Sequence, residues 1–296
     1  MDFYGNPLRT IENEFLRLDY MEKSGPRVLG LYLKGHAHNL FADAHTFIAP
    51  TQYGDYYFWG GHRLWHAPED IPRTYIPDDH NGIRIEELAD GVRLLPPVEA
   101  PTGIRKEMEL HLLPGKAQVR VRHVLINEGH WAVDLAPWAI TQMALGGVAL
   151  IPQQDQPKED AKLPDRSLVL WPYTRLQDER LHLADDYIVV EGKPGVNSSC
   201  KIGVRNPQGW LAYLKDEVLF VKQTEAHLEN PHFDFGCNTE IYVDHRFLEL
   251  ETIGAMVHLE PGASVEHVEN WTVTTCPQAA NTPAGIRQVV KNLKLK

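Results

Sequence analysis

Residues 237–275, CNTEIYVDHRFLELETIGAMVHLEPGASVEHVENWTVTT, carry the alternation of polar and apolar residues that predicts β-strands. Successive side chains of a strand point to opposite faces, so Leu248 and Leu250 share one face of the expected strand. We expect these leucines to face the core. Glu249 and Glu251 then project together from the opposite face, about 7 Å apart at a rise of ~3.3 Å per residue.

The run just before it, from Glu240 to Asp244, alternates in the same way, with Ile241 and Val243 on the apolar face. Carboxylates and an aromatic ring on the other face suit a polyhydroxylated ligand. The alternative is that this face is simply the solvated side of an antiparallel sheet, which is polar in any case. The substrate-binding residues predicted from the two runs are Glu240, Tyr242 and Glu249.

The rest of the chain also has the pattern of a β protein, because its 21 prolines and 22 glycines separate short runs of alternating polarity. Residues 107–112 and 119–127 are two such runs separated by a Pro-Gly turn signal, and they predict a β-hairpin. A similar phrase at 257–262, followed by an alternating run from Ser264, predicts a second hairpin.

These patterns predict an all-β fold of antiparallel sheets in one domain that spans residues 1–296. The polar segment 153–165 is expected to be an exposed excursion between strands, and a domain boundary there is the alternative. Helices are expected only in a short turn at 67–72 and in the C-terminal run 283–296.

Composition argues against several classes of function. The 40 acidic and 29 basic side chains give a formal charge of −11, which opposes binding to a phosphate backbone. The first residues do not read as a signal peptide, and no run of about 18 apolar residues is present. We therefore expect a cytoplasmic protein with no nucleic-acid or membrane partner.

Cys200, Cys237 and Cys276 are widely spaced without a CxxC pair, so they are expected to be small buried residues rather than disulfides or zinc ligands.

The segment 53–69, YGDYYFWGGHRLWHAPE, concentrates side chains that are common in sugar sites. Its glycine pair at 60 and 61 predicts a tight turn, and hence a loop carried on the β scaffold, where binding sites are often built. The candidates on this loop are His62 and His66 as proton donors, Arg63 as a fixed cation and Trp65 as a stacking platform.

A metal site is not predicted in this segment. His62 and His66 are four residues apart, a spacing that ligates metal on a helix, but the glycine pair before them and a proline after them oppose a helix and no HExxH pattern is present. The nearby run of Asp78, Asp79 and His80 leaves a cation on this rim as an open alternative.

Two more segments could carry chemistry. His123 is in phase with the valines before it, so a hydrogen-bonded core histidine is expected in preference to a catalytic one. Trp138 and Gln142 fall on one face of the run 135–143, where they could stack on a ligand and hydrogen-bond to it. A core tryptophan is the alternative.

Several phrases, taken in order along the chain, resemble the aldose 1-epimerase, or galactose-mutarotase-like, superfamily. They are GPRVLGLYLKG at 25–35, NLF at 39–41, the glycine pair, NEG at 127–129, and LET at 250–252 followed by Pro261-Gly262. GGHRLWHAPE together with LELETIG looks closest to one branch of this superfamily. The resemblance implies a large twisted antiparallel β-sandwich with a sugar site on its concave sheet.

In the resembling enzymes a glutamate removes the proton of the anomeric hydroxyl while a histidine protonates the ring oxygen, and the opened ring closes again as the other anomer. The resemblance implies that Glu251 is this base. Trp138 stands about where the histidine of the family lies, so the acid has to come from elsewhere. The candidates are His62, His66 and His123, and the first two join Glu251 as the predicted catalytic residues.

Three functions are therefore in competition. The first is a mutarotase-type isomerase of a sugar or sugar derivative, and the second is a carbohydrate-binding protein that has lost the acid histidine. The third, glycoside cleavage by carboxylates ~6.5–9.5 Å apart, is disfavoured because Glu249 and Glu251 project in parallel from one strand. None of the three requires a cofactor. A phosphorylated sugar stays open, since Arg63 or Arg105 could bind its phosphate.

Overall fold

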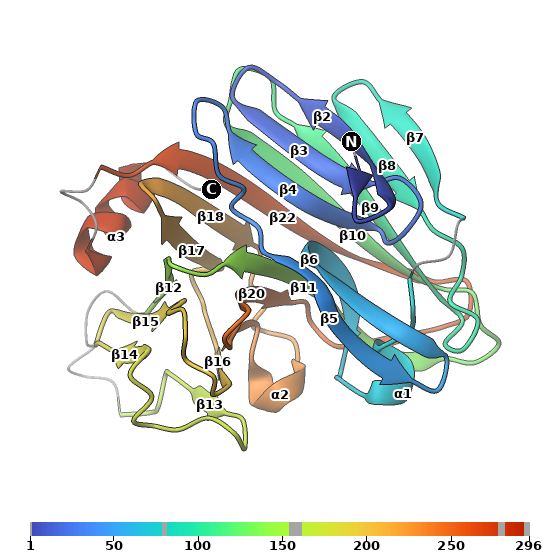
Figure 1. Ribbon diagram of the computed structural model, residues 1–296. Coiled ribbons are helices and arrows are strands. Elements are labelled where there is room, and N and C mark those ends of the chain that lie inside the picture. Colours follow the sequence, from blue (N-terminus) through green and yellow to red (C-terminus); the bar gives the residue numbers. More distant parts are fainter. Residues whose placement is uncertain (1, 79–81, 154–161, 278–281, 293–296) are drawn as a thin grey trace.

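The computed structural model describes residues 2–78, 82–153, 162–277 and 282–292. Two large antiparallel sheets, one of 12 strands and one of 10, pack face to face (Figure 1). The all-β prediction is therefore confirmed.

The 12-stranded sheet carries the candidate site. Its main path runs through β1 (Asp2–Phe3), β2 (Asn6–Glu12), β3 (Leu16–Met21), β4 (Arg27–Leu33), β6 (Gly54–Ala67), β11 (Val133–Ala144), β20 (Phe247–Ile253), β19 (Thr239–Val243), β16 (Cys200–Val204) and β13 (Leu168–Leu170). Two further strands join it from the side, β5 (Asp43–Thr51) on β6 and β21 (Val257–Leu259) on β11.

The 10-stranded sheet forms the opposite layer. Its order is β14 (Leu181–Leu183), β15 (Tyr187–Glu191), β12 (Val148–Pro152), β17 (Trp210–Lys215), β18 (Val218–Thr224), β22 (Ser264–Thr275), β10 (Gln118–Asn127), β9 (Ile104–Leu112), β8 (Gly91–Leu95) and β7 (Arg84–Leu88). The helices of the described residues are α1 (Ile71–Thr74), α2 (Phe233–Gly236) and α3 (Pro283–Asn292).

The alternation in β20 is confirmed. Leu248 and Leu250 are fully buried in the core between the sheets, together with Trp271 of β22. Phe247 and Glu249 point to the other face and line a cavity there. The apolar residues thus hold the strand to the core, and every second side chain is left for the opposite face.

One predicted hairpin is confirmed and the other is wrong. β9 and β10 pair along their length, from Val119 opposite Leu112 to Asn127 opposite Ile104. The second phrase does not fold back on itself, because β21 pairs with β11 whereas β22 pairs with β10 and β18. The Pro-Gly turn after β21 instead carries the chain from one sheet to the other.

The predicted loop at the glycine pair is also wrong, because both glycines lie inside β6. Gly60 and Gly61 have φ values of +102° and +66°. A Cβ on Gly60 would lie 1.9 Å from the carbonyl oxygen of Ala42, and one on Gly61 would lie 2.0 Å from that of Val28. The glycines therefore allow neighbouring backbones to approach closely, rather than allowing the chain to turn.

The shorter predictions have mixed outcomes. The turn expected at 67–72 is the short helix α1, and the C-terminal helix is present as α3. Most of the expected excursion at 153–165 lies outside the described residues. The three cysteines are buried, as predicted.

Candidate active site

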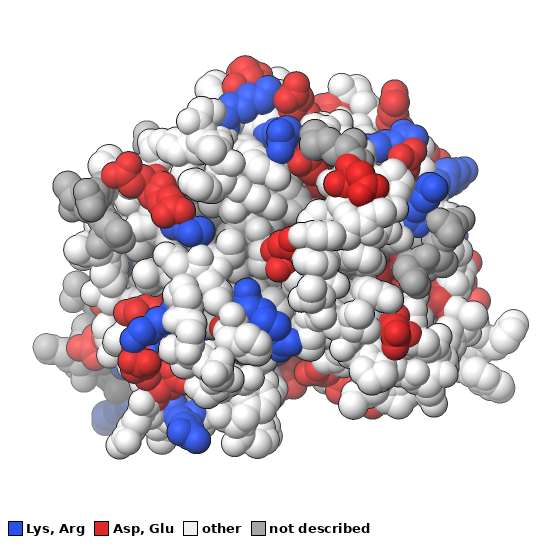
Figure 2. All heavy atoms as spheres, viewed as in Figure 1, with Lys and Arg blue, Asp and Glu red and all other residues white. Residues whose placement is uncertain are grey.

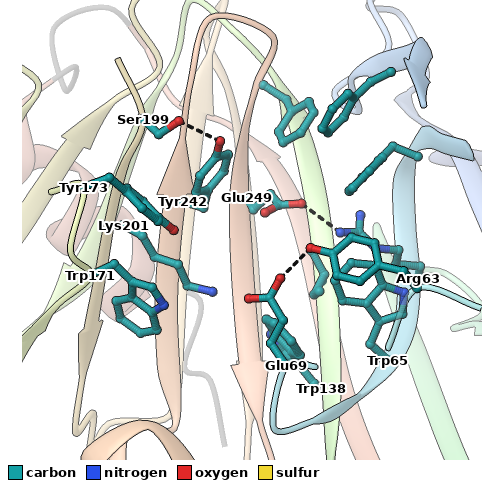
Figure 3. A pocket seen from close by; sticks show the side chains of 15 residues that line it. Arg63, Trp65, Glu69, Trp138, Trp171, Tyr173, Ser199, Lys201, Tyr242 and Glu249 are labelled. Carbon is teal, nitrogen blue, oxygen red and sulfur yellow. Dashed lines mark hydrogen bonds and ion pairs between the residues drawn. The ribbon is translucent and has the colours of Figure 1, made fainter. Parts of the chain in front are cut away.

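A cavity of about 300 Å³ lies on the face of the 12-stranded sheet that points away from the other sheet. Its floor is formed by five neighbouring strands, β6, β11, β20, β19 and β16, and its rim includes residues near α1 and β13 (Figure 3). The volume is at the lower end of the range of ~300–1,000 Å³ that is typical of small-molecule sites. Five predicted site residues line this cavity, namely Arg63, Trp65, Trp138, Tyr242 and Glu249.

Strand register explains why these residues meet. Gln142 lies opposite Glu249, Glu249 opposite Tyr242, and Tyr242 opposite Lys201, in one row across β11, β20, β19 and β16. Neighbouring strands are ~4.8 Å apart, so this row sets Glu249 and Lys201 about 10 Å apart at the backbone. A sugar ring can therefore lie between their side chains.

Glu249 is the carboxylate of this row that faces the cavity. Arg63 and Gln142 both donate to its Oε1, at 3.0 Å each. Burial raises the pKa of Glu249 to about 7, against the opposing effect of Arg63 and with the help of the nearby Glu251. A group with such a pKa can both accept and release a proton near neutral pH.

Glu251 projects from the same face of β20 as Glu249, but it is fully buried and is not among the residues that line the cavity. Its Oε2 accepts a hydrogen bond from the indole of Trp138 at 2.7 Å and another from the ammonium of Lys201 at 3.0 Å. Glu240 lies directly opposite Glu251 in the sheet, and its Oε2 is 2.8 Å from the same ammonium. Lys201 thus separates two carboxylates that would otherwise repel each other across the strands.

The charges of this group follow from its burial. Burial alone would lower the pKa of Lys201, but Glu240 and Glu251 outweigh it and hold that pKa well above its usual value. Burial raises the pKa of Glu240 well above its usual value, although Lys201 opposes the effect. The two carboxylates thus favour the charged form of Lys201, whereas burial favours the neutral form of Glu240.

Aromatic side chains form much of the wall. The Arg63 guanidinium lies over the rings of Trp65 and Phe58, 4.3 Å and 5.4 Å from their centroids. Trp65 also packs edge-on against Trp138 at 5.5 Å. Flat aromatic faces beside hydrogen-bonding groups are suited to a ring that carries both C–H and hydroxyl groups.

His62 lies next to Arg63 in β6 and therefore points to the opposite face, into the core between the sheets. Its Nδ1 is 2.9 Å from the Thr141 hydroxyl and its Nε2 is 2.7 Å from Nε2 of His123. All three residues are fully buried. His123 is thus the hydrogen-bonded core histidine that was predicted, and His62 does not line the cavity.

Three side chains in this core could in principle hold a metal ion, since ligand atoms of His62, His123 and Glu269 lie within 4.8 Å of one another. The two imidazoles are already hydrogen-bonded to each other. The Lys222 ammonium lies 2.9 Å from Oε1 of Glu269 and supplies the positive charge there. The geometry is that of a buried hydrogen-bond network rather than of a metal site.

His66 is also outside the cavity. It is fully buried, with Nε2 3.9 Å from Glu99 and Nδ1 3.4 Å from Arg73.

The sequence left open a cation site at residues 78–80, and two of these three residues lie outside the described ones. Asp78 itself forms an ion pair with Arg27 at 2.7 Å.

Six lining residues that carry a side-chain nitrogen or oxygen were not predicted: Glu69, Tyr75, Trp171, Tyr173, Ser199 and Lys201. Tyr75 donates a short hydrogen bond to Glu69 at the rim. For Lys201 a signal existed, because a lone lysine in the apolar strand CKIGV requires a partner. The others come from loops, where no alternation indicates direction.

The charged side chains on the face shown in Figure 2 are intermixed, with Lys and Arg lying among Asp and Glu. The described residues on this face form no continuous basic patch for a polyanion. Among the described residues, no helix has the length and apolar character needed to cross a membrane.

No family model matches this sequence, and no curated protein matches it either. Solved structures do match. A candidate aldose 1-epimerase from Klebsiella pneumoniae is 11% identical with a TM-score of 0.60, covering 98% of this chain and 83% of that one. A galactose mutarotase-like protein from Lactobacillus casei is 10% identical with a TM-score of 0.58, covering 90% and 100%. A galactose mutarotase related enzyme from Lactobacillus acidophilus is 10% identical with a TM-score of 0.56, covering 92% and 99%.

These similarities define the class of fold, which is a large antiparallel β-sandwich of the galactose mutarotase-like type. The predicted superfamily resemblance is therefore confirmed at the level of the fold. At sequence identities of 10–11%, the similarity to these structures shows a shared fold and does not by itself show a shared reaction.

Proposed function

We propose that this protein is a carbohydrate-active enzyme of the aldose 1-epimerase type, which interconverts the anomers of a sugar in the cavity. The observation that carries the proposal is Glu249, a cavity-facing carboxylate whose pKa of about 7 suits reversible proton transfer. The mutarotase-type names of several proteins with the same fold support the reaction class.

In this mechanism the sugar ring stacks against the aromatic wall and its anomeric hydroxyl meets Glu249. The carboxylate removes the hydroxyl proton, the bond from the anomeric carbon to the ring oxygen breaks, and the resulting aldehyde rotates. Ring closure on the other face returns the proton. Arg63 and Gln142 both bind Oε1 of Glu249, and no hydrogen bond from the described residues reaches Oε2, so Oε2 can act as the base.

The proposal gives Glu249 the role that the resemblance implied for Glu251. Trp138 and Lys201 both bind one oxygen of Glu251, and its side chain is fully buried. Glu251 contributes instead by raising the pKa of Glu249 and by holding Lys201 in place.

A second candidate, a carbohydrate-binding protein without catalysis, is favoured by one observation. Among the described residues, no histidine lines the cavity, and Trp138 lies in its wall. Such a protein would bind a sugar without changing the rate at which its anomers exchange.

Exchange NMR on a panel of aldoses and hexose 6-phosphates separates these functions. The wild-type protein should accelerate exchange between the anomers of at least one sugar. Glu249→Gln should slow that exchange by about 10²–10⁴-fold, the usual contribution of a general base. Glu12→Gln, at an exposed carboxylate of β2, is the matched control.

Sugar binding, measured by quenching of tryptophan fluorescence, should survive in Glu249→Gln. Binding without any accelerated exchange in the wild-type protein would support the non-catalytic alternative. Release of a reducing end from a glycoside would instead indicate cleavage.

A further inference from the structure

The proposed mechanism leaves the ring oxygen without a partner. When the ring opens, the electron pair of the broken bond remains on this oxygen, and it needs a proton or a positive charge. No histidine lines the cavity within the described part of the chain. The cations that do line it are Arg63 and Lys201.

Arg63 is unsuited to this task. It binds Glu249 through Nη2 and is stacked on Trp65. Its Nε and Nη1 are buried and have no hydrogen-bond partner among the described residues. A guanidinium is also a weaker acid than an ammonium.

Lys201 occupies the other wall, on β16, and its side chain extends into the cavity opposite Arg63 (Figure 3). An ammonium has three donors, and the carboxylates of Glu240 and Glu251 lie next to two of them, at 2.8 Å and 3.0 Å. One donor therefore remains for a ligand.

The surroundings hold this ammonium firmly. It lies over the rings of Trp138 and Trp171, 4.8 Å and 4.7 Å from their centroids. Trp138 also donates to Oε2 of Glu251, which is the same oxygen that Lys201 binds. The tryptophan at the expected histidine position thus contacts the cation both directly and through Glu251.

We propose that Lys201 is the proton donor to the ring oxygen, in the role that a histidine has in the resembling enzymes. This inference rests on the proposed function. It makes Lys201 a catalytic residue, and Trp138 and Glu251 positioning residues that fix its ammonium.

The step is balanced as follows. The anomeric hydroxyl gives its proton to Glu249 and becomes the aldehyde oxygen. The bond between the anomeric carbon and the ring oxygen breaks, its electron pair stays on the ring oxygen, and Lys201 donates one ammonium proton there. The products are an open-chain aldehyde, a neutral carboxyl group and a neutral amine. Ring closure on the other face of the aldehyde returns both protons.

Repulsion between Glu240 and Glu251 alone would also explain a cation at this position. A test must therefore remove the proton donor without leaving a buried, unpaired carboxylate. Lys201→Met combined with Glu251→Gln does so, because it leaves a single buried carboxyl, Glu240, whose neutral form burial favours. Glu251→Gln alone is the reference, and Lys34→Met, at an exposed lysine, is the matched control.

Relative to Glu251→Gln, the double variant should lose about 10²–10⁴-fold in kcat for anomer exchange. Its affinity for the sugar, measured by tryptophan fluorescence, should change by only a few fold. Added methylammonium should restore part of kcat, because a small amine can enter the space that the lysine leaves. A structural role would not produce such a rescue.

Equal kcat in the double variant and in Glu251→Gln would overturn the assignment of Lys201 while leaving the proposed function in place. A loss of kcat that methylammonium does not restore, accompanied by an equal loss of sugar binding, would also overturn it. A wild-type protein that does not accelerate exchange of any sugar would overturn the proposed function itself, and this inference with it.

Discussion

Glu249→Gln should change how the stability of the protein depends on pH. Burial raises the pKa of Glu249 from its usual 4.5 to about 7 in the folded protein. The folded state therefore holds a proton that the unfolded chain releases. This contribution to stability is complete below pH 4.5 and is lost as the pH rises through 7.

The magnitude follows from the size of this pKa change. At about 1.4 kcal/mol per pKa unit, the free energy of unfolding of the wild-type protein should fall by ~3 kcal/mol between about pH 4 and pH 8 because of this group. Glutamine does not ionise, so the variant lacks this fall. The replacement of the neutral carboxyl by an amide adds a term that stays nearly constant over the same range, because the effect of the Arg63 charge is already contained in the pKa of Glu249.

Urea unfolding at a series of pH values measures this difference. The free energy of unfolding of Glu249→Gln, relative to the wild-type protein, should rise by about 3 kcal/mol from about pH 4 to pH 8. Glu12→Gln, at an exposed carboxylate, is the matched control. A difference that stays flat, or that moves against the variant as the pH rises, would refute the burial argument for Glu249.

Three further predictions concern the floor of the cavity and the core. Trp138→Phe keeps an aromatic ring but leaves Oε2 of Glu251 without its indole donor, so it should lower the free energy of unfolding by ~1–3 kcal/mol in urea unfolding; an unchanged stability would contradict the hydrogen bond. Gly61→Ala should destabilise by about 3 kcal/mol or more, because its Cβ would meet the carbonyl oxygen of Val28 at a positive φ; wild-type thermal unfolding of this variant would contradict that. Burial lowers the pKa of His267 to about 3, against the opposing charge of Glu269, so stability should be lost as the pH falls below 6.5. His267→Gln should reduce this acid loss by up to about 1.4 kcal/mol per pH unit, and an equally steep loss in the variant would show that His267 does not cause it.

The fold could be predicted where local alternation and long-range packing agree. Leu248 and Leu250 face the core because apolar side chains in one phase of a strand are buried together. The hairpin of β9 and β10 has both strands and its turn within one short segment. The phrase at 257–262 looked the same, but its partner strand, β11, lies far away in the sequence.

The glycine pair shows why local sequence can mislead. Two adjacent glycines predict a turn, yet Gly60 and Gly61 lie within β6, where they let Val28 of β4 and Ala42, just before β5, approach closely. Reading this segment as a loop grouped His62 with Arg63. In a strand these neighbours point to opposite faces, so Arg63 lines the cavity and His62 lies in the core.

The candidate site could be predicted only in part, because local alternation gives the direction of a side chain but not which strands lie side by side. Glu249, Tyr242 and Trp138 are in strands whose alternation gives the direction of each side chain. Lys201 meets them only because β16 lies beside β19, and this strand order depends on tertiary structure. A search that began with charged residues in apolar strands would have found it.

The most direct test of the central claim is a carboxyl-carbon NMR titration of the protein labelled at glutamate. It should show one resonance that titrates near pH 7, that is absent from Glu249→Gln and that shifts when an aldose is added. A Glu249 resonance that titrates near 4.5, or that does not respond to any sugar, would contradict the assignment of this cavity as a site of sugar chemistry.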